Sequence, residues 1–235
     1  MTLKYKRILL KISGEALGGE KGMGFDEPTM DAICGGVKKA HELGVQIGIV
    51  VGGGNFWRGR SSGKMERTLA DKIGMLATVM NALAVSDKLE QLGVPTEVFT
   101  SITMPQVAQP FTRKDALRAM DEGKIAVFGG GTGNPFFSTD TAAVLRAAEI
   151  DADVILLAKN IDGVYSADPR KVPDAVKYES ITYSDVLAQR LQVMDSTATS
   201  LSMDNKIPVL LFALKDPENI LRAIMGEKIG TIVQG

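Results

Sequence analysis

The chain has 235 residues, of which 45% are hydrophobic and 23% charged, and its formal net charge is −1. These values are near globular averages. Basic and acidic residues are interspersed along the chain, with no basic tail or stripe, so we expect no nucleic-acid polymer as a partner. The single cysteine, Cys34, excludes an internal disulfide and fits a reducing, cytoplasmic location. Because His41 is the single histidine, we expect neither a zinc site nor a Cys–His nucleophile. Any metal should have oxygen ligands, as Mg²⁺ does.

Hydropathy along the chain predicts no membrane segment. The apolar run near the N-terminus, within residues 7–12, is too short for a signal peptide. No run reaches the roughly 18 apolar residues that a membrane span needs. We therefore expect no membrane association.

Apolar strand-like runs alternate with helical patterns along the chain. Strands are expected at residues 7–12, 45–51, 95–99, 124–128, 152–158, 207–212 and 231–233. Helices are expected at residues 26–43, 68–92, 113–120, 141–148, 182–191, 196–203 and 217–225, with irregular chain at 101–110. This alternation predicts an α/β fold, a three-layer α/β/α sandwich with a mostly parallel central sheet. We expect one domain over residues 1–235.

The helix at residues 68–92 is unusual because its middle, residues 73–85, is apolar almost all round. Such a helix must be covered on every side, by its own domain or by a partner subunit. Its methionines are expected in the core.

Three glycine-rich loops follow expected strands: Ser13-Gly14, residues 52–55 and residues 129–133. The carboxyl ends of parallel strands meet at one edge of a sheet, where ligands bind. Residues 129–140, GGGTGNPFFSTD, also open a helix, and a helix N-terminus with convergent backbone N–H groups is a phosphate site. A carboxylate there, Asp140, would repel phosphate unless a cation stands between them.

The cations near these loops are Lys11, Arg58, Arg60 and Lys159. Lys11 lies inside an apolar strand, where a lysine is costly unless it is paired. Asp140 is its expected partner, with Asp195 as the alternative. Known nucleotide motifs do not explain the loops: residues 14–19 have the glycine spacing of a P-loop, but Glu20 stands where its lysine belongs. The G-x-G-x-x-G fingerprint is absent after every expected strand.

Six segments together resemble the bacterial uridylate kinases (UMP kinases) of the amino-acid kinase superfamily. They are KISGEAL (11–17), VVGGGNFWRG (50–59), GMLATVMNALA (74–84), GGTGNPFFSTDTAA (130–143), IDGVYSADP (161–169) and MGEKIGT (225–231). TGNPFFSTD is the most specific of them. The resemblance covers essentially the whole chain and implies reversible phosphoryl transfer from ATP, with Mg²⁺, to UMP in pyrimidine nucleotide biosynthesis.

The resemblance also implies roles for individual residues. The catalytic group would be Lys11, Arg58 and Asp140. ATP would contact Lys11, Ile12, Ser13, Gly14, Gly54, Arg58, Tyr165 and Asp168. It would also contact either Lys159 or Asn160: the family usually has a threonine just before a Lys-Val-Asp-Gly segment, and one of these two residues takes the place of that threonine. UMP would contact Gly53, Asp71, Thr132, Gly133, Asn134, Pro135, Phe136, Phe137, Ser138 and Thr139. The N-terminal part would bind mainly UMP, and the part from about residue 150 mainly ATP.

Family members form homohexamers and respond to nucleotides, so the resemblance implies GTP as an activator and UTP as an inhibitor. The stretch associated with the GTP response would be Gly19, Glu20, Lys21, Gly22, Met23 and Gly24. Some relatives have arginine where Ser86 lies here. A partner subunit would also cover the apolar helix.

Two other functions fit the same residues. A carbamate, acetylglutamate or glutamate kinase could use the same scaffold, and a nucleotide sensor could bind without transfer. The joint presence of Lys11, Arg58 and Asp140 favours an enzyme. In the reaction with UMP, the attacking group is a phosphate oxygen of UMP, which is already anionic at neutral pH. That reaction therefore needs positioning and charge neutralisation but no general base.

Overall fold

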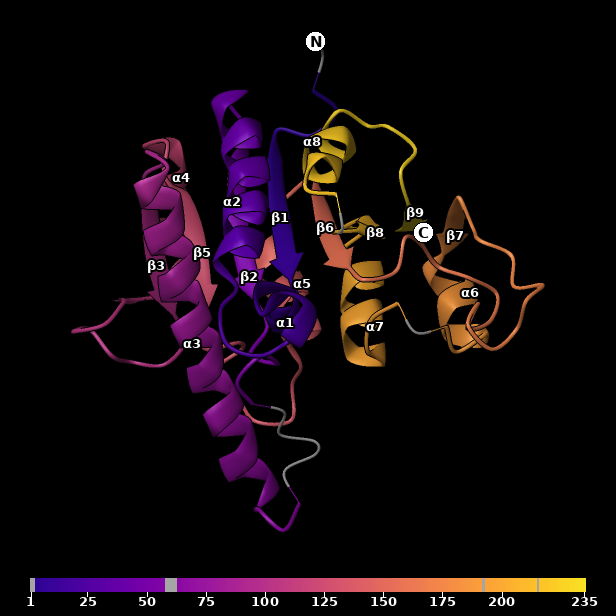
Figure 1. Ribbon diagram of the computed structural model, residues 1–235, viewed down its shortest axis with the longest axis horizontal. Helices are drawn as coiled ribbons and strands as arrows, with labels where there is room; N and C mark the ends of the chain where they lie inside the picture. Colours follow the sequence, from indigo (N-terminus) through magenta and orange to yellow (C-terminus); the bar gives the residue numbers. More distant parts are fainter. Residues whose placement is uncertain (1–2, 58–62, 192, 215) are drawn as a thin grey trace.

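The computed structural model describes residues 3–57, 63–191, 193–214 and 216–235. Nine strands form one sheet in the order β4-β3-β5-β2-β1-β6-β8-β9-β7 (Figure 1). Adjacent strands pair in parallel except β8 and β9, which are antiparallel. The expected mostly parallel sheet is confirmed.

The strand bounds lie close to the expected ones. They are β1 Arg7–Ile12, β2 Gln46–Val51, β3 Thr96–Thr100, β4 Gln109–Pro110, β5 Ile125–Gly129, β6 Val154–Lys159, β7 Ser180–Thr182, β8 Val209–Ala213 and β9 Thr231–Gln234. The edge strands β4 and β7 were not expected, since two or three residues are too few to show an alternating pattern. Residues 101–110 are therefore not wholly irregular.

The helices are α1 Gly14–Leu17, α2 Glu27–Glu42, α3 Arg67–Gln91, α4 Arg113–Asp121, α5 Thr139–Glu149, α6 Tyr183–Ala188, α7 Ser196–Asp204 and α8 Glu218–Ile224. The chain between α1 and α2 contains a short 3₁₀ helix, Gly19–Lys21. The side chain of Asp26 accepts a hydrogen bond from the Thr29 N–H and so caps α2. Ser138 caps α5 in the same way.

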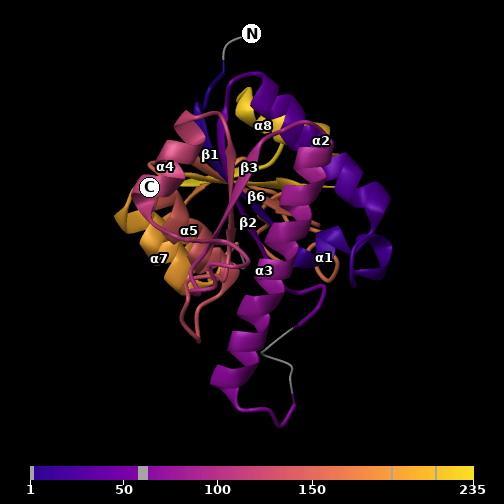
Figure 2. The same cartoon turned by 90° about the vertical axis from the view of Figure 1, so that its left-hand side faces the viewer.

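The sheet separates two helical layers (Figure 2). One layer contains α1, α2, α3 and α8, and the other contains α4, α5 and α7. Side chains along a strand alternate between the two layers. In β1, Ile8, Leu10 and Ile12 join the first core, whereas Leu9 joins the second. Lys11 therefore points towards the layer that contains α5.

Within this chain, helix α3 is covered on one face only. Its buried face packs on β3 and β5 and includes the polar residues Thr78, Asn81 and Ser86. Leu69, Leu76, Met80 and Leu83 are exposed. Within the described residues, α3 is the one helix that is long and apolar enough to cross a membrane. Sequence hydropathy, in contrast, predicts no membrane-spanning segment. A core helix passes the same test.

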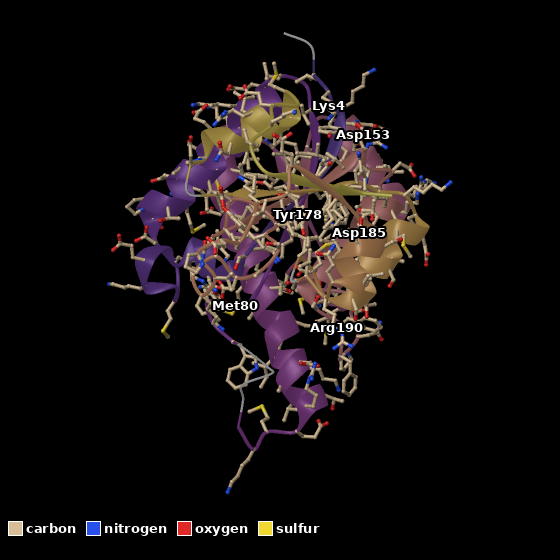
Figure 3. All side chains as sticks on the ribbon, turned by 90° about the vertical axis from the view of Figure 1, so that its right-hand side faces the viewer. Lys4, Met80, Asp153, Tyr178, Asp185 and Arg190 are labelled. Atoms are coloured by element: carbon tan, nitrogen blue, oxygen red, sulfur yellow. The ribbon has the colours of Figure 1, made fainter. Side chains whose placement is uncertain are left out.

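The parallel strands bring their carboxyl ends to one end of the molecule. Lys4 and Asp153, which precede β1 and β6, lie at the upper end in Figure 3, and Arg190 lies towards the opposite end. The glycine-rich loops after β1, β2 and β5 follow carboxyl ends, so they gather at this second edge.

Candidate functional site

A buried ion pair lies at the carboxyl edge of the sheet. Lys11 Nζ is 2.8 Å from Asp140 Oδ1, and the two side chains are 9% and 17% exposed. Lys11 comes from the end of β1, and Asp140 from the first turn of α5. A carboxylate is favourable at a helix N-terminus, and it also balances the lysine. The predicted contact between these two residues is confirmed.

A second lysine approaches the same carboxylate. Lys159 ends β6, the neighbour of β1, and its Nζ is 4.0 Å from Asp140 Oδ2. The same ammonium donates a hydrogen bond to the Val193 carbonyl. Burial lowers the pKa of Lys159, an effect that Asp140 opposes and Lys11 reinforces. Asp140 thus has one lysine near each carboxylate oxygen.

Asp195, the alternative partner for Lys11, has different contacts. Its carboxylate accepts hydrogen bonds from the hydroxyls of Ser138 and Thr141, and from the Ala198 N–H at 3.0 Å. It therefore joins the start of α7 to the start of α5. This contact fixes the end of the helix that carries Asp140.

The loops after β1 and β2 pack backbone against backbone. A Cβ on Gly14 would lie 2.3 Å from the Gly52 carbonyl oxygen, so a larger residue requires the loops to move apart. Two fully or nearly buried amides hold this junction: Asn81 donates to the Gly52 carbonyl and to Asn55 Oδ1 at 2.7 Å, and Asn55 donates back at 3.0 Å. The glycines expected on phosphates are held in place by these amides.

A cavity of about 210 Å³ lies between α3 and the loop 130–139. Its lining contains seven of the residues expected to contact UMP: Gly53, Asp71, Thr132, Asn134, Phe137, Ser138 and Thr139. Gly54, expected on ATP, also lines it, together with Trp57, Gly74, Met75, Thr78 and Gly131. Three other expected UMP residues, Gly133, Pro135 and Phe136, belong to the same loop but not to this lining.

Asp71 connects α3 to the loop across this cavity. Its Oδ2 accepts the Phe136 N–H at 2.8 Å and the Arg67 guanidinium at 2.7 Å. Phe136 has a positive φ of 73°, which a non-glycine residue adopts at a cost. The Arg67 guanidinium also lies 5.3 Å from the centroid of the Phe136 ring. The carboxylate thus holds the loop in a strained conformation.

A larger cavity, of about 520 Å³, lies beside α6 and α7. Its polar lining includes Ser138, Asp140, Lys159, Arg190, Asp195, Ser196 and Thr199. Ser138 lines both cavities, and Asp140, the partner of Lys11, follows two residues later. The carboxylate of the ion pair therefore belongs to the larger cavity and lies two residues from the serine that both cavities share.

Other expected ATP residues lie outside this lining. Ile12 is fully buried in the core, so only its main chain can face a ligand. Ser13 precedes α1 in extended conformation. Tyr165 donates to Asp162, which raises the pKa of the phenol, and Asp168 accepts from Arg170, which lowers the pKa of that carboxyl.

Between the two alternatives for the remaining ATP contact, Lys159 lines the larger cavity, whereas Asn160 is exposed and outside that lining. Arg58 and Arg60 lie outside the described residues.

In the stretch implied for GTP, Gly24 exchanges two hydrogen bonds with Asn55: its N–H donates to the Asn55 carbonyl, and its carbonyl accepts from the Asn55 amide.

Sequence reasoning missed the residues of α3 that face the site. Thr78 and Asn81 were counted within an apolar helix, although they are polar and three residues apart, and so share one face. This three-residue spacing of polar side chains could have identified the face of α3 that lies towards the site. Ser101, whose hydroxyl donates to the Gly131 carbonyl at 2.8 Å, lies in a segment expected to be irregular and had no signal.

Comparison with known proteins agrees with this geometry. A family model described as the amino acid kinase family matches residues 6–221. A UMP kinase from Bacillus anthracis has 38% identity and a TM-score of 0.95, with 98% of this chain and 96% of that chain covered. A UMP kinase from Ureaplasma parvum has 36% identity and a TM-score of 0.93, with 99% and 100% covered.

A more distant likeness is a uridylate kinase from Archaeoglobus fulgidus, with 26% identity, a TM-score of 0.74, and 96% and 99% of the two chains covered. The similarity to all three structures spans nearly the full length of each, and the family match spans most of this chain. The chain belongs to the amino acid kinase family.

Proposed function

We propose that the protein is a UMP kinase that catalyses reversible phosphoryl transfer from ATP to UMP, giving ADP and UDP for pyrimidine nucleotide biosynthesis. The observation that carries the proposal is the Lys11–Asp140 pair, whose carboxylate lines the larger cavity two residues from Ser138, the residue that lines both cavities. An enzyme of phosphoryl transfer must hold the donor and acceptor phosphates close together, and a cation there neutralises their charge. The full-length likeness to UMP kinases at 36% and 38% identity supports uridylate as the acceptor.

The smaller cavity is assigned to UMP. Its volume of about 210 Å³ suits part of a nucleotide, and the exposed Phe137 on its lining offers an aromatic face to a base. Asp71 lines the cavity and is a hydrogen-bond acceptor for ribose hydroxyls. Backbone groups of Gly53 and Gly54 can approach the phosphate closely because they carry no side chain.

The larger cavity is assigned to ATP, with Lys159 rather than Asn160 as the contact at the end of β6. The residues there fit Mg²⁺ that is bound to the nucleotide: Mg²⁺ takes one or two carboxylates together with phosphate oxygens, and Asp140 and Asp195 both line the cavity. Bound Mg²⁺ would neutralise charge on the phosphates. In this assignment the C-terminal part of the domain, from about residue 150, binds mainly ATP.

Lys11 supplies fixed positive charge to the phosphoryl group in transit. Asp140 orients its ammonium group, and Asp195 holds the start of α5 and thereby Asp140. The attacking UMP phosphate oxygen is already anionic, so no general base is required. Arg58 is proposed as a second catalytic cation from the loop after β2.

The test is an ADP-release assay with Mg-ATP and one acceptor at a time: UMP, CMP, AMP, carbamate, acetylglutamate and glutamate. We expect release with UMP and little with the others, with CMP the closest competitor. Release with an amino-acid acceptor but not UMP would instead assign the scaffold to another branch of the family. Tight binding of UTP or GTP without any transfer would identify a sensor.

We further propose a homohexamer in which the exposed face of α3 packs against a second copy. Leu69, Ile73, Leu76, Met80 and Leu83 follow the alternating four- and three-residue spacing of helix–helix seams. A helix that presents this stripe can pair with its own copy about a two-fold axis. The resemblance to the family extends this pair to six subunits.

GTP activation and UTP inhibition are proposed on the same resemblance. The hydrogen bonds between Gly24 and Asn55 support a route from the stretch 19–24 to the glycine loop of β2. A cytoplasmic location is proposed because Cys34, the single cysteine, is a free buried thiol. Assay of UDP formation with and without GTP tests the effector.

A further inference from the structure

Helix α5 contains a buried cation that the proposed reaction does not use. Arg146 is only 5% exposed. Its guanidinium donates to Glu149 and to Ser101 Oγ, the latter at 3.0 Å, and it lies 3.8 Å from the centroid of the Phe111 ring. Burial lowers the pKa of Arg146, and Glu149 opposes this effect. A buried guanidinium is costly, so its partners identify what it holds.

The partner of interest is Ser101, which follows β3 at the carboxyl edge of the sheet. Its hydroxyl lies between Arg146 Nη2, at 3.0 Å, and the Gly131 carbonyl oxygen, at 2.8 Å. A guanidinium has donors only, so the serine oxygen must accept from it. The single hydroxyl hydrogen is then directed to Gly131. Arg146 therefore fixes the direction of the hydrogen bond that Ser101 makes.

The loop that contains Gly131 lies directly on Ser101. A Cβ on Gly133 would approach both the Ser101 Cβ and its carbonyl oxygen to 3.1 Å, and Gly133 has a φ of 82°. On the α3 side, the Gly130 N–H donates to Thr78 Oγ1 at 2.8 Å. Two hydroxyls from separate elements thus hold successive residues of this loop.

This contact also orients the next peptide group. In a trans peptide the carbonyl of Gly131 and the N–H of Thr132 point in opposite directions. With the carbonyl bound to Ser101, the N–H of Thr132 is turned away from Ser101. Gly131 and Thr132 both line the smaller cavity. The orientation of a polar group at that lining therefore depends on Ser101.

We propose that Ser101 and Arg146 are positioning residues for the acceptor: Ser101 holds the Gly131–Thr132 peptide of the acceptor cavity, and Arg146 acts through Ser101. The inference rests on the proposed assignment of this cavity to UMP. Neither side chain lines the cavity, so both influence acceptor affinity without touching the ligand.

The competing explanation is purely structural, because Arg146 also packs on Phe111 and forms an ion pair with Glu149 within α5. Glu149→Gln separates the two. It removes the charge partner of Arg146 and leaves the contact with Ser101 in place. Ser101→Ala removes a single oxygen and is the variant least disturbing to the fold. Arg146→Lys keeps the charge but loses the fork that reaches Ser101 and Glu149 together.

The experiment measures KM for UMP and for Mg-ATP, and the calorimetric Kd for UMP, in wild type, Ser101→Ala, Arg146→Lys, the double variant and Glu149→Gln. Ser101→Ala is expected to raise KM and Kd for UMP about three- to ten-fold, the factor for one hydrogen bond, with KM for ATP unchanged. Arg146→Lys is expected to do the same, and the double variant no more than either, because both remove one contact. Glu149→Gln is expected to lower Tm without changing KM for UMP.

Unchanged KM and Kd for UMP in folded Ser101→Ala would overturn the inference, as would effects that multiply in the double variant. A rise in KM for UMP with Glu149→Gln equal to that of Ser101→Ala would assign a structural role instead. If wild type forms no UDP, the proposed function fails, whereas wild-type activity with unaffected variants rejects only this inference.

Discussion

Lys11 shows how a single residue can predict a site. A charged side chain inside the apolar run of β1 requires a partner, and strand alternation places it on the α5 side of the sheet. Asp140 is the partner, at 2.8 Å. The second lysine, Lys159, could not be placed from sequence, because its distance from Asp140 depends on the pairing of β1 with β6.

Asp71→Asn tests the acceptor cavity at one residue. The substitution keeps the shape of the side chain but removes the charge of the carboxylate that accepts hydrogen bonds from the Phe136 N–H and the Arg67 guanidinium. We expect KM for UMP to rise about ten-fold or more, since hydrogen bonds to charged groups are the stronger ones, with KM for ATP unchanged. Steady-state kinetics check this, with Asp204→Asn on the exposed end of α7 as control. Equal effects on both substrates would contradict the assignment.

Cys34 predicts a loss of stability at alkaline pH. Burial raises the pKa of its thiol from 9.0 to about 12. The folded state therefore keeps a proton that the unfolded chain loses above pH 9, and the free energy of unfolding falls as pH rises from 9 towards 12. Urea unfolding at pH 8 and pH 10.5 should show a smaller loss in Cys34→Ala than in wild type. Equal losses would exclude Cys34 as a contributor.

At the scale of the element, α3 presents two different faces. One face packs on the sheet and carries Asn81 and Thr78 towards the glycine loops. The other face is an exposed apolar stripe that includes Leu76 and Met80. The hydropathy of the sequence predicts an apolar helix. It does not show which face lies on the sheet and which is exposed, because the inner face has few polar residues.

Leu76→Glu is expected to dissociate the proposed oligomer. A charge buried in a helix–helix contact without a partner is strongly unfavourable. Sedimentation velocity should show smaller species for this variant, with unchanged far-UV circular dichroism. Asp204→Lys, which changes charge on the exposed end of another helix, is the control and should sediment as wild type. An unaltered sedimentation coefficient for Leu76→Glu would rule out this face as the contact.

The regular elements were predictable from sequence, and the exceptions have physical reasons. Strands such as β1 and β6 are buried on both faces, so they appear as continuous apolar runs. Edge strands of two or three residues have no period to detect. The glycine loops were recognisable because glycines directly follow apolar runs in the sequence. The structure adds a physical reason at Gly14, which faces a backbone oxygen that leaves no room for a side chain. Ser101 and Arg146 were missed because their contact joins residues 45 apart in sequence.

At the scale of the whole molecule, the parallel sheet collects the parts of the site. Loops from β1, β2 and β5 meet at one edge, and two cavities of about 210 and 520 Å³ open on either side of Ser138. In the proposed reaction the phosphoryl group passes from the ligand of one cavity to that of the other, with Lys11 as the neutralising cation. Lys159 lies 4.0 Å from Asp140, so the carboxylate keeps a cation nearby when Lys11 is removed. Lys11→Ala should therefore fold.

The most direct measurement is the rate of UDP formation from UMP and saturating Mg-ATP in a rapid-quench experiment, for wild type and Lys11→Ala. We expect wild type to form UDP. Lys11→Ala, with an unchanged circular dichroism spectrum, should be slower by about 10²–10⁴, the usual effect of removing a group that stabilises transition-state charge. A rate for Lys11→Ala close to that of wild type would contradict the central role of the lysine. Absence of UDP from wild type would contradict the function itself.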